Sequence, residues 1–290
     1  MTRTPSAVRA AMPADLAALR VPERTMPLLR DLIAQHTGIF YDDDRLDLLQ
    51  ERLSPLAIER GFDSLLDYYY LLRYDSDDTT AWAKVMDALS VLETYFWRES
   101  DQLHALAAVI VPELVARRRD PIRIWSMPCA SGEEPLSMAI ALEEAGWFDR
   151  AAIEIHAADA SGKALARAAE RRYGERSFRQ LPAALRGKYF SRDGESWRVH
   201  DALFDRITSW TRLNIMDAAG VAPFVGSDVV FCRNLFIYFT PAAIREVVTR
   251  LAAAMPSPAY VCVGASESLL RLNSGFDLQD IGGAYVYVKS

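Results

Sequence analysis

The sequence is poor in cysteine, and this shortage excludes two kinds of site. Its 290 residues include three cysteines, Cys129, Cys232 and Cys262, which lie far apart and form no Cys-x-x-Cys pair. A zinc cluster, a redox dithiol or another metal site is therefore not expected. The three thiols are predicted to be buried and reduced.

The sequence also lacks long apolar runs and an excess of positive charge. No apolar run approaches the roughly 20 residues of a membrane span, and the N-terminus lacks the basic-then-apolar order of a secretory signal. We therefore expect a cytoplasmic protein without membrane insertion. The net charge is −6, with 17 acidic and 11 basic side chains in residues 1–100 and a balance in the remainder. Neither part has the positive excess of a nucleic-acid binder.

The first third of the chain has the pattern of a helical domain. Residues 1–22 are predicted to be a loose tail. Residues 23–92 carry apolar side chains at helical spacing, separated by glycines and capping residues, and are predicted to form an all-helical domain. The expected helices cover residues 24–36, 46–60 with a kink or restart at Pro55, 64–72, and 79–89 behind the capping pair Asp78-Thr79.

The pattern changes after a predicted connecting segment at residues 93–120. Short β-branched runs then alternate with helical patterns, which indicates a mostly parallel sheet covered on both faces. The expected strands are residues 122–125, 153–158, 228–232 and 259–264, and the expected helices are residues 135–145, 161–170 and 241–255. Residues 284–288 are predicted to add an antiparallel edge strand. Residues 197–199 and 207–213 are expected to be strands of a small insert.

The loop after the first predicted strand is rich in small residues but acidic where it enters a helix. It runs through Ser126–Gly132 into Glu133 and Glu134, and it contains neither a GxGxxG pattern nor a P-loop lysine. Two acids at a helix start repel a pyrophosphate, which disfavours NAD, FAD and ATP. They suit a ligand that carries an ammonium or sulfonium group. The alternative is that both acids only complement the helix dipole.

A second acid, Asp159, ends the second predicted strand 25 residues after Glu134. Acids at this position of an α/β sheet accept hydrogen bonds from ribose hydroxyls. The alternative is that Asp159 caps the next helix through Ser161. Together with the acidic loop, Asp159 indicates a nucleoside without phosphates, and S-adenosylmethionine fits that description.

Two further segments carry polar groups suited to a binding site. Arg233 and Asn234 follow a buried strand, where a charged side chain needs a partner. Tyr238 lies five residues on, either over the same site or as a core aromatic residue. Between the predicted domains, residues 93–99 place Thr94 and Arg98 near a possible ligand site.

These segments resemble the signature blocks of the CheR-type chemoreceptor glutamate methyltransferases. The blocks are residues 94–99, 125–135 and 231–239 together with Asp159, and the resemblance spans roughly residues 24–290. It implies an N-terminal all-helical domain followed by a Rossmann-like S-adenosylmethionine-dependent methyltransferase domain at residues 121–290, with a small β-subdomain at about 175–210. It further implies methyl transfer from S-adenosylmethionine to glutamate side chains of the cytoplasmic domain of a chemoreceptor, in chemosensory adaptation.

The resemblance also assigns roles to single residues. The positions that it assigns to the cofactor are Thr94, Arg98, Glu134, Asp159, Asn214, Ile215, Arg233 and Asn234. The positions that it assigns to catalysis are Arg98, Arg233 and Tyr238. Within the first set, Asp159 is expected to hold the ribose and Glu134 the methionine ammonium.

The chain departs from the family pattern in three places. Leu92 stands where the family often has an asparagine that contacts the cofactor. The loop at residues 191–196 is shorter than in members that dock a receptor's C-terminal tether peptide, which makes tether docking doubtful. The helix with Arg45, Arg52 and Arg60 is less basic than the receptor-facing helix of well-known members.

The expected mechanism is an in-line methyl transfer to a carboxylate that is already ionised at neutral pH. Arg98 and Arg233 are expected to orient it, with one arginine partly engaged elsewhere, and Tyr238 to donate a hydrogen bond to it. Aromatic faces such as those of Phe96 or Trp97 are expected to favour the sulfonium. The alternatives are a non-catalytic protein that binds S-adenosylmethionine or S-adenosylhomocysteine, a small-carboxylate O-methyltransferase and, more distantly, a nicotinamide oxidoreductase.

Overall fold

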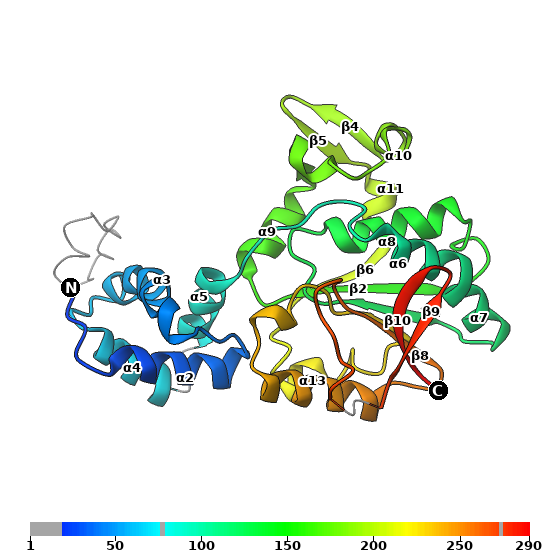
Figure 1. Cartoon of the computed structure of the whole chain (residues 1–290). Coiled ribbons are helices and arrows are strands. Elements are labelled where there is room, and N and C mark those ends of the chain that lie inside the picture. Colours follow the sequence, from blue (N-terminus) through cyan, green and yellow to red (C-terminus); the bar gives the residue numbers. More distant parts are fainter. Residues whose placement is uncertain (1–18, 76–78, 273–274) are drawn as a thin grey trace, which may run out of the picture. The chain divides into compact units, whose positions relative to one another are not determined.

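Figure 1 shows a computed structural model of the chain, which describes residues 19–75, 79–272 and 275–290. The chain divides between Ser90 and Val91 into two compact units. Within the described residues, no helix is both long enough and apolar enough to cross a membrane.

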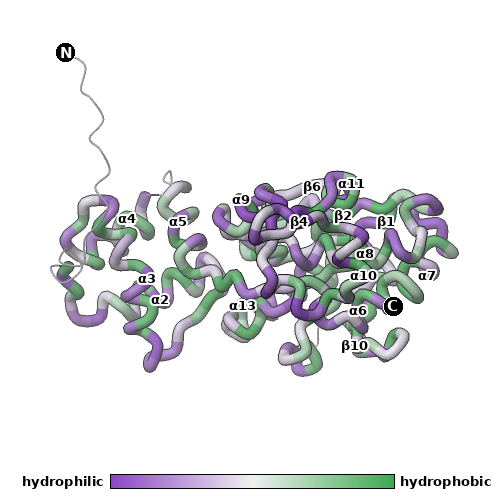
Figure 2. Tube along the Cα trace, turned by 90° about the horizontal axis from the view of Figure 1, so that it is seen from above, coloured by the Kyte–Doolittle hydropathy of each residue, from purple (hydrophilic) through white to green (hydrophobic). Residues whose placement is uncertain are grey.

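The first unit is all-helical, as the sequence predicts. Its helices are α2 (Thr25–Thr37), the short η1 (Asp43–Arg45), α3 (Leu46–Glu59), α4 (Leu65–Tyr74) and α5 (Thr79–Leu89). The tubes of α2, α3, α4 and α5 carry both hydrophobic and hydrophilic positions (Figure 2), and their apolar faces meet in one core. The side chain of Ser64 caps α4, whereas the predicted tail to residue 18 and the predicted cap Asp78 lie outside the described residues.

The expected restart of the helix at Pro55 is wrong, because α3 runs through this residue from Leu46 to Glu59. Leu49, Leu53 and Ala57 are fully buried on one face of α3, on both sides of the proline. Burial of this continuous apolar face outweighs the backbone hydrogen bond that a proline inside a helix cannot make.

The second unit is built on a seven-stranded sheet in the order β6-β2-β1-β7-β8-β10-β9. The first five strands in this order are parallel to one another, and β10 and β9 are antiparallel. The bounds are β1 (Ile122–Ser126), β2 (Ile153–Asp159), β6 (Ile207–Arg212), β7 (Val229–Phe231), β8 (Ala259–Cys262), β9 (Asp277–Ile281) and β10 (Ala284–Lys289).

Helices cover both faces of this sheet, with α8 (Glu133–Glu144) and α13 (Pro241–Ala254) on opposite sides (Figure 1). The segment before β1 is a nearly continuous helix of α6 (Ser100–Ala105), a π-helical turn (Leu106–Ile110) and α7 (Val111–Ala116). The connections also form α9 (Gly162–Glu170), α10 (Ala183–Tyr189), α11 (Asp201–Phe204), α12 (Ala218–Val221) and the 3-10 turns η3 (Glu175–Phe178) and η4 (Phe236–Tyr238). The predicted doubly covered, mostly parallel sheet is therefore confirmed.

The positions of two strands differ from the sequence expectation. The strand expected at residues 207–213 for the insert is β6, which pairs with β2 and ends the parallel part of the large sheet. The strand expected at the antiparallel edge, β10, is internal, because β9 pairs with its free side. Four of the five residues of β9 are exposed, so β9 lacks the apolar pattern by which a buried strand is recognised.

The insert is a three-stranded antiparallel sheet in the order β3-β5-β4 (Arg172–Tyr173, Ser196–Val199 and Phe190–Asp193). Aromatic rings hold it to the body of the second unit. Phe96 is fully buried and packs against Tyr173, Phe178 and Phe190, with ring centroids 4.8–5.2 Å apart. Phe96 is therefore part of the core and presents no ring face to a ligand, whereas Trp97 is half-buried and the expectation for its ring stays a prediction.

Candidate functional site

Five parallel strands end on the same edge of the sheet, and most of the predicted site residues follow these ends. Glu134 comes after β1, Asp159 ends β2, Asn214 and Ile215 follow β6, and Arg233 follows β7. Ligands of open α/β sheets bind outside the carboxyl ends of the strands. The topology thus brings together residues that are up to 99 positions apart in the sequence.

The loop between β1 and α8 passes close to the side chains of Trp210 and Tyr173, and this requires glycine at position 132. Gly132 has a φ of +97°, and a Cβ atom there would lie 2.8 Å from the Trp210 ring and 3.2 Å from the Tyr173 hydroxyl. Only glycine combines this backbone conformation with so close an approach. The loop is therefore fixed where it delivers Glu133 and Glu134 to the first turn of α8.

The two glutamates of this turn have different hydrogen-bond and ion-pair partners. Glu133 is buried and accepts hydrogen bonds from the hydroxyls of Ser131 (2.7 Å) and Ser177 (2.9 Å). It thus joins two loops. Glu134 accepts a hydrogen bond from Ser126 Oγ (2.8 Å), and its Oε2 lies 3.5 Å from Arg233 Nε. Burial raises the pKa of Glu134 to about 7, partly offset by the charge of Arg233. Glu134 is therefore the acid that an added cation would stabilise.

Asp159 uses both carboxylate oxygens in backbone contacts. Its Oδ2 accepts the N–H of Ala130 (2.9 Å) and its Oδ1 accepts the N–H of Ser161 (2.8 Å), while Ser161 itself caps α9. Asp159 is 4% exposed. Asp159 therefore ties the loop after β1 to the loop after β2. Its contact with Ser161 is the capping role that the sequence offers as an alternative.

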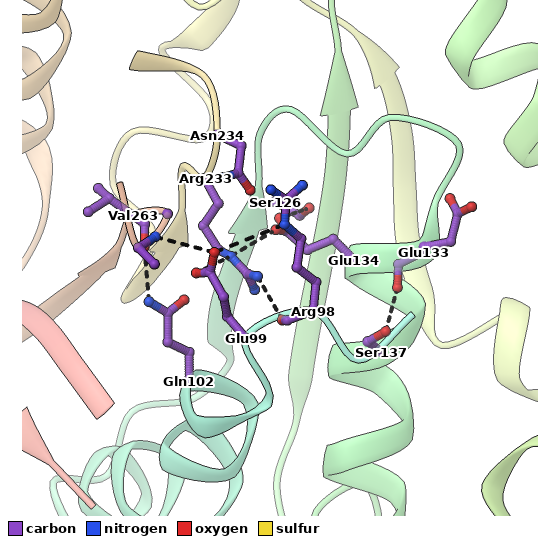
Figure 3. A network of polar contacts seen from close by, with 12 residues as sticks. Arg98, Glu99, Gln102, Ser126, Glu133, Glu134, Ser137, Arg233, Asn234 and Val263 are labelled. Carbon is purple, nitrogen blue, oxygen red and sulfur yellow. Dashed lines mark hydrogen bonds and ion pairs between the residues drawn. The ribbon is translucent and has the colours of Figure 1, made fainter. Parts of the chain in front are cut away.

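Arg233 lies at the centre of a polar network (Figure 3). It is 3% exposed, its Nη2 donates to the carbonyl oxygen of Arg98 (2.7 Å), and its Nε lies 3.5 Å from both Glu99 Oε2 and Glu134 Oε2. Among the described residues, neither Arg233 Nε nor Glu99 Oε2 has a hydrogen-bond partner. These two atoms lie 3.5 Å apart in the ion pair, so their burial is compensated by opposite charge rather than by a hydrogen bond.

Arg98 differs from Arg233 in its exposure. The Arg98 side chain is 28% exposed, and its Nε lies 4.0 Å from Glu99 Oε1. Its guanidinium lies 5.4 Å from the centre of the Tyr95 ring. Arg98 is thus the arginine of the pair that is accessible, and Arg233 is the one held by two carboxylates.

The remaining predicted residues lie in loops or short turns. Thr94 is half-buried in the non-helical segment before α6, and Tyr238 is half-buried at the end of η4. The side-chain oxygen of Asn214 accepts the N–H of Met216 (3.0 Å). Ile215 is buried, and its carbonyl oxygen accepts from Arg250 (2.8 Å).

Asn234 has a left-handed backbone with a φ of 58°. Its N–H donates to Glu267 Oε2 (2.8 Å). Sequence reasoning missed Glu267 and Glu99, which both contact the loops of the predicted arginines. Glu99 directly follows Arg98 in the sequence, and this position next to a predicted site residue could have indicated it. Glu267 follows β8 within Gly264-Ala-Ser-Glu, a sequence with no pattern of its own.

The described residues contain no group of three or more histidine, cysteine or acidic side chains that could hold a metal ion. The three cysteines are buried free thiols, as predicted. Burial raises the pKa of the Cys129 and Cys232 thiols well above the usual value, which makes them poor nucleophiles.

Sequence comparisons identify the two parts of the chain. Residues 25–90 match the family described as "CheR methyltransferase, all-alpha domain", and residues 92–282 match "CheR methyltransferase, SAM binding domain". The chain is 34% identical to chemotaxis protein methyltransferase 2 of Vibrio cholerae, over 90% of this chain and 91% of that protein.

Two other relatives are similar over comparable lengths. The chain is 29% identical to chemotaxis protein methyltransferase 1 of Pseudomonas aeruginosa, over 90% of this chain and 96% of the relative. It is also 29% identical to the chemotaxis protein methyltransferase of Borreliella burgdorferi, over 87% and 90% of the two chains.

S-adenosylmethionine is the cofactor of the matched domain, and the residues at the strand ends fit it. Glu134 is an acid whose ionised form a cation would stabilise, and Asp159 ends the adjacent strand β2. The fold, the arrangement of the strand ends and the matches over residues 25–90 and 92–282 agree: the chain belongs to the CheR methyltransferase family.

Proposed function

We propose that this protein transfers the methyl group of S-adenosylmethionine to glutamate side chains of a chemoreceptor's cytoplasmic domain, which gives glutamate methyl esters in chemosensory adaptation. The similarity to chemotaxis protein methyltransferases supports this proposal. The observation that carries it is the arrangement of Glu134, buried Arg233 and accessible Arg98 at one edge of the sheet.

The cofactor supplies an activated methyl group on a sulfonium. In our proposal, Glu134 holds the ammonium of its amino-acid tail and Asp159 holds the ribose. Asn214 and Ile215 after β6, together with Thr94 and Asn234, complete the binding site. Arg98 and Arg233 belong to both the cofactor site and the catalytic site.

The acceptor carboxylate needs orientation rather than a base, because it is ionised near neutral pH. Good positioning supplies about 7–11 kcal/mol of a barrier. In our proposal, Arg98 steers the carboxylate, while Arg233 stays engaged by Glu99 and Glu134 and holds the backbone of Arg98 through its Nη2. This division prevents two arginines from binding the nucleophile too tightly. Tyr238 donates a hydrogen bond to the oxygen that does not attack.

The receptor is proposed to be recognised without a tether peptide. The turn between β4 and β5 contains only Gly194 and Glu195 between the strand ends, so this hairpin is short. We place the reaction in the cytoplasm, where the methylated part of a chemoreceptor lies.

Incubation with tritiated S-adenosylmethionine and receptor-containing membranes tests the proposed reaction. We expect a labelled band of receptor size that releases volatile methanol at high pH, because carboxyl methyl esters are base-labile. Label that survives base, or no labelled protein, contradicts the proposal. A labelled small carboxylic acid without labelled protein instead favours a small-molecule O-methyltransferase.

One observation favours a second function, a regulator that binds the cofactor without catalysis. Leu92 occupies a position where a polar side chain is expected, and Arg233 is already neutralised by two carboxylates. Calorimetric binding of S-adenosylhomocysteine without methyl transfer to any receptor preparation would support this alternative.

A further inference from the structure

We propose that Glu267 is a positioning residue for the methyl transfer: its carboxylate holds the loop that carries Arg233, Asn234 and Tyr238. The methyl transfer itself rests on the proposed function, whereas the positioning role of Glu267 rests on the hydrogen bonds of its carboxylate. Glu267 lies after β8, and the loop that it holds lies after β7, the neighbouring strand.

The carboxylate of Glu267 accepts four backbone N–H groups. Its Oε2 accepts from Asn234 (2.8 Å) and from Gly264 (2.6 Å). Its Oε1 accepts from Phe236 (2.6 Å) and, at a longer distance, from Ile237 (3.3 Å). Three of these donors belong to the loop after β7. One half-buried side chain thus accepts three backbone donors of this loop and one of its own turn, which requires an acceptor with two oxygens.

The loop needs such support because its backbone is unusual. Asn234 adopts a left-handed conformation with a φ of 58°, which costs free energy for a residue other than glycine. The next regular element is the three-residue turn η4. Hydrogen bonds to an ionised acceptor are stronger than those to a neutral one. The contacts with Glu267 therefore fix the backbone from which the side chains of Arg233 and Tyr238 extend.

The turn that carries Glu267 also holds the segment of the other arginine. Ala265 donates its N–H to Glu99 Oε1 (3.2 Å), and Val263 accepts a hydrogen bond from Gln102 Nε2 (2.9 Å; Figure 3). Residues 263–267 are therefore bound both to the segment with Arg98 and Glu99 and to the loop with Arg233. This turn thus supports the segments of both arginines, which the hydrogen bond from Arg233 to the carbonyl oxygen of Arg98 joins directly.

Gly264 allows this close assembly. A Cβ atom at Gly264 would lie 2.5 Å from Asn234 Nδ2 and 2.9 Å from Glu267 Oε2, so a larger residue would displace the contact between the turn and the loop. Gly264→Ala is thus a second way to disturb the loop without removing the charge of Glu267.

The test compares Glu267→Gln with the wild type and with Glu246→Gln, which changes an exposed glutamate on α13. An amide keeps one acceptor oxygen and places a donor against the loop N–H groups. We expect faster hydrogen exchange in a peptide that covers residues 234–237, with unchanged exchange in β7 and β8. We expect the turnover number to fall roughly 10- to 100-fold, whereas Glu246→Gln resembles the wild type.

All rates are measured at a temperature well below the thermal unfolding midpoint of each variant. Loss of folding then does not imitate loss of positioning. Turnover of Glu267→Gln within twofold of the wild type, or exchange at residues 234–237 like that of the wild type, overturns the proposal. If Glu267→Gln does not fold, Gly264→Ala is judged by the same two criteria. A wild type that methylates no receptor refutes the proposed function instead, and hydrogen exchange then still decides whether Glu267 holds the loop.

Discussion

The Nε atom of Arg233 lies 3.5 Å from the Oε2 atom of Glu134, with both side chains largely withdrawn from water. Each residue follows one of two adjacent parallel strands, β7 and β1. The attraction lowers the cost of burying both charges, but burial still raises the pKa of Glu134 to about 7. This pair therefore links the stability of the domain to the binding of a cationic ligand.

Removal of Arg233 is expected to destabilise the protein as well as to abolish turnover. Arg233→Ala leaves Glu99 and Glu134 without their shared counter-charge, and breaking a buried pair typically costs about 3–5 kcal/mol. Urea unfolding measures this loss. Arg123→Ala, which removes an exposed partner of Glu154, is the control and should cost less than about 1 kcal/mol. Equal unfolding free energies of Arg233→Ala and the control would show that the network does not hold the fold.

Cofactor binding is expected to weaken as the pH falls below about 7. The ionised form of Glu134 attracts an ammonium group, and its pKa of about 7 means that acid removes this charge. The affinity for S-adenosylhomocysteine should fall towards tenfold per pH unit below that value. Calorimetry at several pH values from 5.5 to 8 measures the change. Glu134→Gln should bind weakly and without this dependence, and an equal slope in both proteins would remove Glu134 from the cofactor site.

The same pKa predicts the sign of a stability change. The carboxyl of Glu134 holds its proton more tightly in the folded protein than in the unfolded chain, where its pKa is near 4.5. Its contribution to the free energy of unfolding is therefore lost as the pH rises from about 4.5 to about 7. Comparison of urea unfolding of the wild type and Glu134→Gln across this range isolates the contribution. A difference between the two proteins that grows more favourable to the wild type at higher pH would contradict the assignment.

Asp159→Asn is expected to weaken S-adenosylhomocysteine binding by roughly tenfold to hundredfold, because hydrogen bonds to a charged group contribute about 1.5–3 kcal/mol. The amide also places a donor against the N–H of Ala130 or Ser161. Calorimetry gives the dissociation constants. Asp217→Asn, which changes the cap of α12, is the matched control. Unchanged binding by Asp159→Asn would leave Asp159 with a purely structural role.

Tyr238→Phe is expected to lower turnover by roughly tenfold or more, with little change in the affinity for S-adenosylhomocysteine, because the hydroxyl is proposed to contact only the acceptor carboxylate. Tyr285→Phe, at an exposed position on β10, should behave like the wild type. Receptor methylation rates and calorimetry separate the two quantities. If Tyr238→Phe turns over at the wild-type rate, Tyr238 has no catalytic role.

The sequence predicts the parts of the fold that follow from periodic burial. The helical first unit, the four buried strands and the covering helices all carry apolar patterns, and the structure confirms them. β9 could not be predicted, because its residues are mostly exposed and its position depends on pairing with β10. The same limit applies to β6, since only long-range pairing assigns it to the large sheet.

The site follows a similar division. Asp159 and Arg233 were recognisable because charged residues stand at or just after strand ends, and Glu134 because it enters a helix behind the loop that follows β1. Their partners were not, since the contacts of Glu99 with Arg233 and of Glu267 with Asn234 join positions 134 and 33 residues apart. The expected partial engagement of one arginine is found in Arg233, which two carboxylates face.

A crystal structure with S-adenosylhomocysteine tests the central claim most directly. We predict the ligand at the carboxyl ends of β1, β2 and β7, with its amino group at hydrogen-bond distance from Glu134 and its ribose hydroxyls at Asp159. A ligand bound elsewhere, or one that leaves both acids uncontacted, would contradict the claim that these strand ends form the methyl-transfer site.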